Sequence, residues 1–197
     1  MALCITSEYK ITLAKHHLTR SCWRMILSGK EISRLMGKEI QINPFNPKQL
    51  NPNSYNLTLH PKLLLYEDEV LDMKQENKVQ EIMIPESGYV LQPDKLYLGK
   101  TVEKTQTDHY IPFLEGRSSV ARLGITVHLT AGLGNVGANG HWTLEISCVQ
   151  PVRIYPHVEI CQIYFQEIKG EFVTYRNGNG KYHNEDVQPS LMYREFL

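Results

Sequence analysis

The sequence predicts a mainly β protein, an all-β sandwich or barrel, on three observations. Short stretches in which apolar and polar residues alternate recur along the chain, as in strands with one buried face. Turn residues separate these stretches at close spacing, which is typical of sandwiches and barrels. Pro44, Pro47 and Pro52 would break any helix in the region just before the first clear stretch.

One short helix is expected near residue 30. Ser28 can cap its N-terminus, and Glu31 stands at the capping-box distance from Ser28. Gly37 would end the helix, because glycine readily adopts the left-handed conformation found there. The expected apolar face consists of Ile32, Leu35 and Met36.

Strands are predicted through the first half of the domain. The alternating stretch YNLTL (55–59) predicts one strand, and residues 88–105 predict a strand, a tight turn at Pro93–Asp94 and a second strand. Residues 67–82 are charged and irregular, so we expect them to form an excursion that faces solvent.

Further strands are predicted in the second half. The stretches ITVHLT (125–130) and HWTLEISCV (141–149) each place their apolar residues on one face. Residues 152–168 predict another strand pair around Pro156. The expected organisation is an extension over 1–24, a β domain over 25–170, and a polar, glycine-rich and mobile tail over 171–197. The extension is either an appendage or the result of an upstream start assigned in error.

Composition excludes several classes of protein. Lys and Arg together number 21, as do Asp and Glu, so bulk electrostatic capture of nucleic acid or of an anionic membrane is not expected. We expect no membrane-spanning segment, because no apolar run approaches the required length, and residues 1–24 lack the apolar core of a signal peptide. The four cysteines form no C-x-x-C pair, which favours reduced thiols in a cytoplasmic protein.

The stretch EGRSSVARLGITVHLTAG (115–132) is the first candidate for chemistry. It holds two arginines and two serines between two glycines, with no acid after its first residue. In a helical turn Ser118 and Arg122 would be neighbours, and Arg117 would add a cation with forked donors. Phosphate is the natural ligand for such a segment. The alternative is a surface helix whose arginines pair with carboxylates elsewhere.

Glu145 is the second candidate. It stands in mid-strand between Leu144 and Ile146, where a desolvated carboxylate would suit a general base. The residues alone leave open a second interpretation, in which Glu145 faces solvent from a half-buried strand.

Six blocks of sequence carry a resemblance to a known family. In chain order they are MILSGKEI, INPFNPKQLNPNSYNLTL, YVLQPDKLYLGKTVE, LEGRSSVARLGITVHLTAG, GHWTLEI and PVRIYPHVEICQIYF. Together, over about residues 25 to 190, they resemble the dCTP deaminase family, which is related to the trimeric dUTPases. The resemblance implies a distorted jelly roll or β-barrel, and a homotrimer with active sites between subunits.

The same resemblance implies roles for individual residues. It makes Glu145 the general base, with Ser118 and Arg122 as its helpers, and places Arg117 and Ser119 on the phosphates. It implies that the tail closes over the triphosphate, from a neighbouring subunit. The other implied nucleotide contacts are Thr130, Ala131, Asn135 and Gln162 in the β domain, and Tyr175, Lys181, Tyr182 and Glu185 in the tail.

The implied reaction is hydrolytic deamination of dCTP to dUTP without zinc. Zinc deaminases combine H-x-E with P-C-x-x-C, and this chain has no such combination. Mg²⁺ would enter only with the triphosphate. One branch of the family also hydrolyses dUTP to dUMP and pyrophosphate, and Gly132, after Thr-Ala, favours that branch if a small residue leaves room for a second water. Inhibition by dTTP is a further possibility that the family suggests.

Four positions depart from the pattern that the family usually shows. Asn56 and Asn135 stand where aspartates are usual, Ala138 replaces an aromatic residue, and Glu185 replaces a glutamine. These departures bear on nucleotide affinity and on the second hydrolytic step. They keep two alternatives open: a dUTPase without deaminase activity, and a non-catalytic nucleotide-binding trimer.

Overall fold

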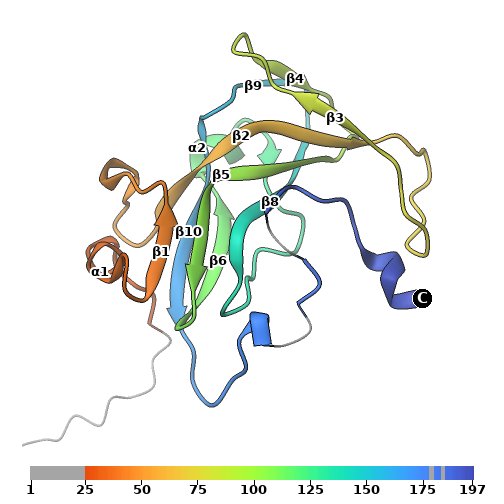
Figure 1. Ribbon diagram of the computed structural model, residues 1–197. Coiled ribbons are helices and arrows are strands. Elements are labelled where there is room, and N and C mark those ends of the chain that lie inside the picture. Colours follow the sequence, from red (N-terminus) through yellow and green to blue (C-terminus); the bar gives the residue numbers. More distant parts are fainter. Residues whose placement is uncertain (1–24, 178–179, 183–184) are drawn as a thin grey trace, which may run out of the picture.

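The computed structural model describes residues 25–177, 180–182 and 185–197, and the predicted extension over 1–24 lies outside this range (Figure 1). The fold is mainly β, as predicted. Its strands are β1 (Ile40–Asn43), β2 (Tyr55–Tyr66), β3 (Val79–Met83), β4 (Tyr89–Leu91), β5 (Tyr97–Thr107), β6 (Tyr110–Gly116), β7 (Ile125–Thr126), β8 (Asn139–Cys148), β9 (Val152–Ile154) and β10 (Glu159–Glu167). Its helical segments are α1 (Gly29–Leu35), α2 (Ser118–Ala121) and the 3-10 turns η1 (Pro47–Gln49), η2 (Tyr175–Asn177) and η3 (Met192–Phe196).

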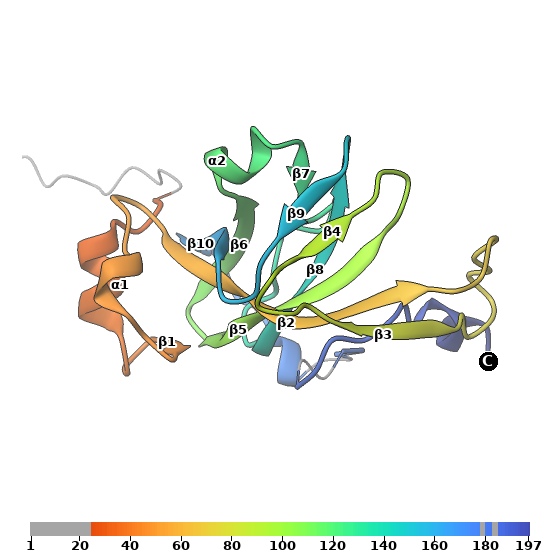
Figure 2. The same ribbon diagram turned by 90° about the horizontal axis from the view of Figure 1, so that it is seen from above.

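A strongly curved eight-stranded sheet organises the described residues. Its main path runs β6–β10–β2–β5–β8–β7, while β1 also pairs with β5 and β3 also pairs with β2. A separate two-stranded sheet, β4–β9, covers one end (Figure 2). The strand pairs are antiparallel throughout these sheets.

The predicted N-terminal helix is confirmed as α1. The Ser28 hydroxyl accepts a hydrogen bond from the Glu31 N–H at 3.2 Å, which satisfies one of the free donors at the helix start. Gly37 follows the helix with φ +73°, a conformation that a residue with a side chain adopts only under strain. Ile32 and Leu35 are buried against the sheet, so α1 is part of the core.

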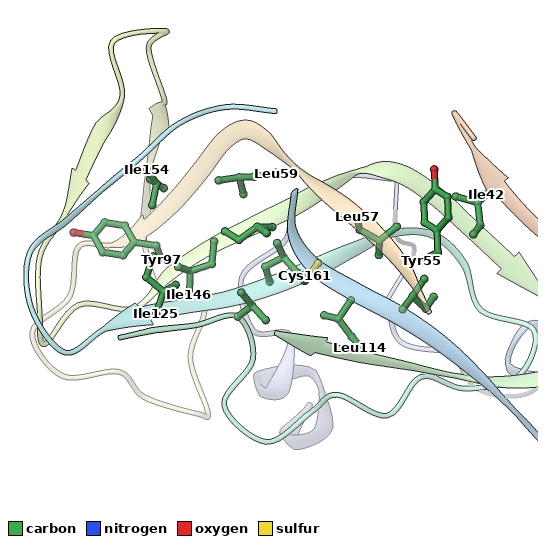
Figure 3. Close-up of a cluster of buried hydrophobic side chains, with 14 of the residues drawn as sticks. Ile42, Tyr55, Leu57, Leu59, Tyr97, Leu114, Ile125, Ile146, Ile154 and Cys161 are labelled. Carbon is green, nitrogen blue, oxygen red and sulfur yellow. The ribbon is translucent and has the colours of Figure 1, made fainter. Parts of the chain in front are cut away.

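The hydrophobic core runs along the inside of the curved sheet (Figure 3). Tyr97, Ile146 and Ile154 lie at one end of the core, and Ile42 and Tyr55 lie at the other. The predicted alternation is confirmed in β2, where Tyr55, Leu57 and Leu59 are buried, and in β8 for Leu144 and Ile146, while Trp142 is only partly buried. Cys148 and Cys161 are buried free thiols, and burial raises the pKa of both.

The strands of two predicted pairs are present, but they pair with other strands than expected. β4 and β5 flank the predicted turn, where Asp94 has φ +60°, yet β4 pairs with β9. The long β5 already has β2 on one edge and β8 on the other, so no edge is left for β4. For the same reason β9 and β10 do not pair, because β10 lies between β2 and β6.

The predicted solvent-facing excursion is shorter than expected. Residues 67–78 are mostly exposed and irregular, but β3 begins at Val79 and pairs with the far half of β2, with Gln80 opposite Leu65. β10 pairs with β2 only over residues 55–58. The backbone groups of β2 beyond this segment would lack partners on that edge, and β3 provides them. Among the described residues, no helix is long and apolar enough to cross a membrane.

Replacing Ser28 by alanine tests the cap of α1. We expect Ser28→Ala to lower the free energy of unfolding by about 1 kcal/mol, because the Glu31 N–H loses its acceptor. The matched control is Ser33→Ala on the exposed face of the same helix, with an expected change within about 0.5 kcal/mol. Urea denaturation measures both, and equal losses would show that the cap does not stabilise α1.

Candidate active site

A cavity of about 620 Å³ opens beside β8. Its wall is made by the loop 129–135, parts of β5 and β8, and tail residues that include 188–190. Of the residues predicted for the site, the wall contains Thr130, Ala131, Asn135, Glu145, Tyr175 and Tyr182. The other predicted residues, Arg117, Ser118, Ser119, Arg122, Gln162, Lys181 and Glu185, are not part of it.

Glu145 determines the path of the loop beside it. Its backbone N–H donates to the carbonyl of Val127 at 2.9 Å, and its carboxylate Oε2 accepts the N–H of Leu129, also at 2.9 Å. The predicted strand over 125–130 is therefore wrong beyond Thr126. The side chain of Glu145 takes the N–H that a neighbouring strand would otherwise bind, and the chain turns outward to form the cavity wall.

The far end of this loop is anchored on β6. Leu114 N–H donates to the carbonyl of Gly132 at 2.8 Å, and Gly134 N–H donates to the carbonyl of Pro112 at 2.8 Å. A Cβ atom at Gly132 would lie 2.7 Å from the carbonyl oxygen of Leu114, so this close approach requires glycine. Gly132 is not part of the cavity wall. The close approach to β6 gives this glycine a packing role, and the expectation that a small residue here leaves room for a second water stays a prediction.

The wall residues that sequence reasoning missed include His141, Trp142 and Thr143 of β8. Trp142 donates from Nε1 to the Thr105 hydroxyl at 2.8 Å, and His141 Nδ1 lies 2.9 Å from the carbonyl of Thr101. Burial, and then the nearby charge of Lys100, lowers the pKa of His141. The available signal was the strand period, because His141 and Thr143 share the face of Glu145.

Described residues of the tail, namely Tyr175, Tyr182 and residues 188–190, line the cavity of their own chain. Tyr175 N–H donates to the carbonyl of Val136 at 2.8 Å, and the Tyr175 hydroxyl accepts the N–H of Tyr182 at 3.1 Å. Further on, the Tyr66 hydroxyl accepts the N–H of Ser190 at 3.0 Å. The described tail residues that line this cavity belong to the same chain, and a tail supplied by a neighbouring subunit stays a prediction of the resemblance.

Acidic tail residues hold the tail on the sheet. Asp186 accepts hydrogen bonds from Lys100 at 2.7 Å and from Lys62 at 3.0 Å. Partial burial opposes ionisation of Asp186, but these two lysines outweigh it and hold its pKa well below the ordinary range. Glu185 pairs with Lys104, and Val187 is buried against Leu64 and Leu98.

The serine–arginine segment lies elsewhere. Ser118 begins α2, and Arg122 N–H donates to the Ser118 carbonyl at 3.1 Å, so the predicted helical turn is confirmed. Figure 2 shows α2 on one side of the sheet and the C-terminal segment on the other. Arg117 pairs with Glu159 at 3.1 Å, as the alternative interpretation of this segment expected. One chain therefore carries two separate groups of predicted residues.

The described part of the chain has no group of three or more His, Cys, Asp or Glu side chains arranged to hold a metal ion. Of the carboxylates named above, Asp186, Glu185 and Glu159 are paired with basic side chains. A Mg²⁺ ion that arrives with a triphosphate needs few protein ligands, because phosphate oxygens and water supply most of its shell.

Comparison with known proteins identifies the family. The model of the dCTP deaminase-like family matches residues 26–168. The chain belongs to this family. Two relatives of the family named "dCTP deaminase, dUMP-forming" are similar over nearly their whole length: the protein of Clostridium acetobutylicum is 59% identical over 174 residues, and that of Hathewaya histolytica is 60% identical over 173. These alignments cover 88% and 87% of this chain and 99% of each relative.

A solved structure supports the fold. The 2′-deoxycytidine 5′-triphosphate deaminase of Agrobacterium tumefaciens superposes with a TM-score of 0.58 at 20% sequence identity. The match covers 73% of this chain and 48% of that one, so this chain corresponds to about half of the larger protein. At this identity the likeness concerns the fold alone, and it agrees with the distorted β-barrel expected from the sequence.

Replacing Gly132 by alanine separates the two roles considered for it. We expect Gly132→Ala to lower the free energy of unfolding by about 1–3 kcal/mol, because the new methyl group meets the Leu114 carbonyl. The stability control is Gly116→Ala, whose methyl would meet only the Val127 side chain, at 3.7 Å. Calorimetry measures both. An unchanged melting temperature, with loss of pyrophosphate release alone, would contradict the packing role.

Proposed function

We propose that this chain deaminates dCTP to dUTP and ammonia, and then hydrolyses dUTP to dUMP and pyrophosphate. The observation that carries the proposal is the place of Glu145, whose carboxylate lines the cavity beside Thr130 and Ala131. Relatives at 59% and 60% identity bear the name of this two-step activity. The family residues for deamination, Ser118, Arg122 and Glu145, are all present.

Glu145 has the geometry of a general base. Its Oε2 is held by the Leu129 N–H, and we assign Oε1 to accept a proton from the attacking water. The carboxylate takes a proton as the water oxygen bonds to C4 of cytosine, and returns it to the ring or to the departing amine. The C4–N bond then breaks, so one dCTP and one water give one dUTP and one ammonia.

The active site is formed by two subunits in this proposal. Ser118 and Arg122 belong to the reaction but lie across the sheet from the cavity of their own chain. A second copy can bring its α2 to the cavity, and ring closure of three copies supplies every cavity in the same way. Arg122, fixed by Ser118, then polarises the group under attack at the base.

The triphosphate brings its Mg²⁺ with it, and the protein supplies cations and donors around it. Arg117 and Ser119 of the α2 segment, and Lys181 and Tyr182 of the tail, are the proposed phosphate contacts. Reaction without zinc, inhibition by dTTP, and a cytoplasmic location remain predictions of the sequence.

Product analysis tests the proposed function. With dCTP and Mg²⁺, we expect equal amounts of ammonia and pyrophosphate together with dUMP, while Glu145→Gln should lower ammonia release by about 10²–10⁴-fold and still bind dCTP. The control is Glu171→Gln, an exposed tail carboxylate, with unchanged rates. Pyrophosphate from dUTP without ammonia from dCTP would mean a dUTPase, and neither product would mean a non-catalytic binding protein.

Mixed trimers test whether two subunits form one site. Glu145→Gln and Arg122→Ala should each be inactive, and co-refolding them in equal amounts should restore about a quarter of the wild-type activity, since random assembly pairs intact halves at that frequency. Native mass spectrometry verifies that mixed trimers form. Mixed trimers without activity would show that one chain supplies both residues.

A further inference from the structure

We propose that Glu159 and Asn56 are positioning residues that hold Arg117 ready for the triphosphate. The proposal rests on the proposed function, in which Arg117 binds phosphate. Neither residue belongs to the contacts that the family resemblance implies. Glu159 lies in β10 and Asn56 lies in β2.

Two contacts to Glu159 fix the guanidinium of Arg117. Its Nη1 donates to the main-chain carbonyl of Glu159 at 2.7 Å, and its Nη2 lies 3.1 Å from the carboxylate Oε2. The two side chains are 31% and 35% exposed, so part of this ion pair still meets solvent. An anion can bind there without first ordering a free arginine side chain, which otherwise costs conformational entropy.

Asn56 in turn fixes the carboxylate of Glu159. Its Nδ2 donates at 2.7 Å to Oε2, the same oxygen that faces Arg117. The Asn51 amide donates at 2.7 Å to Oδ1 of Asn56, which determines the orientation of the Asn56 amide. Asn56 is only 6% exposed, so this chain of contacts leads from the buried β2 to the half-exposed arginine.

The contact with Glu159 explains why an amide at position 56 suits this arrangement. An aspartate there would place two carboxylates at the 2.7 Å separation that the amide and Glu159 now have. Like charges at that distance disfavour joint ionisation, and one of them would turn away or take a proton. Two carboxylates would also compete more strongly with phosphate for Arg117. Arg117 is therefore paired with one carboxylate, that of Glu159, and the Asn56 amide orients this carboxylate.

Gln162 supports the same segment from its other side. Its Nε2 donates to the carbonyl of Gly116 at 3.2 Å, and its Oε1 accepts the Ser54 hydroxyl at 2.7 Å. Gln162 thus fixes the backbone immediately before Arg117 and makes no part of the cavity wall. Both the backbone and the guanidinium of Arg117 are held by β10.

An exchange of acid and amide tests the proposal in the full-length protein. We expect Asn56→Asp and Glu159→Gln each to raise KM for dCTP roughly fivefold with kcat within about twofold, because substrate binding weakens and the chemistry is unchanged. The double variant restores one acid and one amide, and should return KM to within about twofold of wild type. The control is Glu167→Gln, an exposed carboxylate at the end of β10, with unchanged KM.

A second readout addresses the phosphates alone. Inhibition by inorganic tripolyphosphate should weaken in each single variant in parallel with KM, and recover in the double variant. Glu159→Gln keeps the size of the side chain and carries the test if Asn56→Asp lowers the melting temperature. Single variants with wild-type KM, or a double variant whose KM rises by the product of the two single effects, would overturn the proposal. A wild-type chain that releases no ammonia from dCTP would instead overturn the proposed function.

Discussion

The hydrogen bond from the Leu129 N–H to the Glu145 carboxylate is the contact on which the rest of the site depends. It joins residues sixteen positions apart, and it ends β7 after two residues. A carboxylate that accepts a backbone N–H is a strong acceptor, so the loop is held at this end by a charge-assisted bond. At its other end the loop is bonded to β6. The loop that forms part of the cavity wall is therefore hydrogen-bonded at both ends, and the proposed catalytic carboxylate makes one of these bonds.

The tail and α2 stand in different relations to this cavity. The tail is tied to the same face by the Lys62–Asp186–Lys100 contacts and by the apolar packing of Val187. On the opposite side, β10 holds Gly116 and Arg117, the residues that lead into α2, through Gln162 and Glu159. The curved sheet separates the two groups, so its own shape sets which parts of the site one chain can bring together.

Much of the fold was predictable from local patterns, because α1 and the strands β2 and β8 follow from capping residues and from the strand period. The partners of β4 and β9 were not, since pairing depends on which edges the long strands leave free. The end of β7 was missed because a side chain sixteen residues away takes the N–H of Leu129. The motif indicated Glu145, which lies in the cavity wall, and the helical turn of α2, but no pattern indicated that Glu185 would bind Lys104 or that Asn56 would bind Glu159.

The placement of the tail over its own cavity has a consequence for how the two halves of the site respond to dilution. Contacts within one chain form at an effective concentration set by the connecting segment, and dilution does not change it. Contacts that α2 would make to another subunit follow mass action. If two subunits form each site, as proposed, a diluted sample loses the arginine side of the site while the contacts within each chain persist, and specific activity falls with enzyme concentration although each chain stays folded.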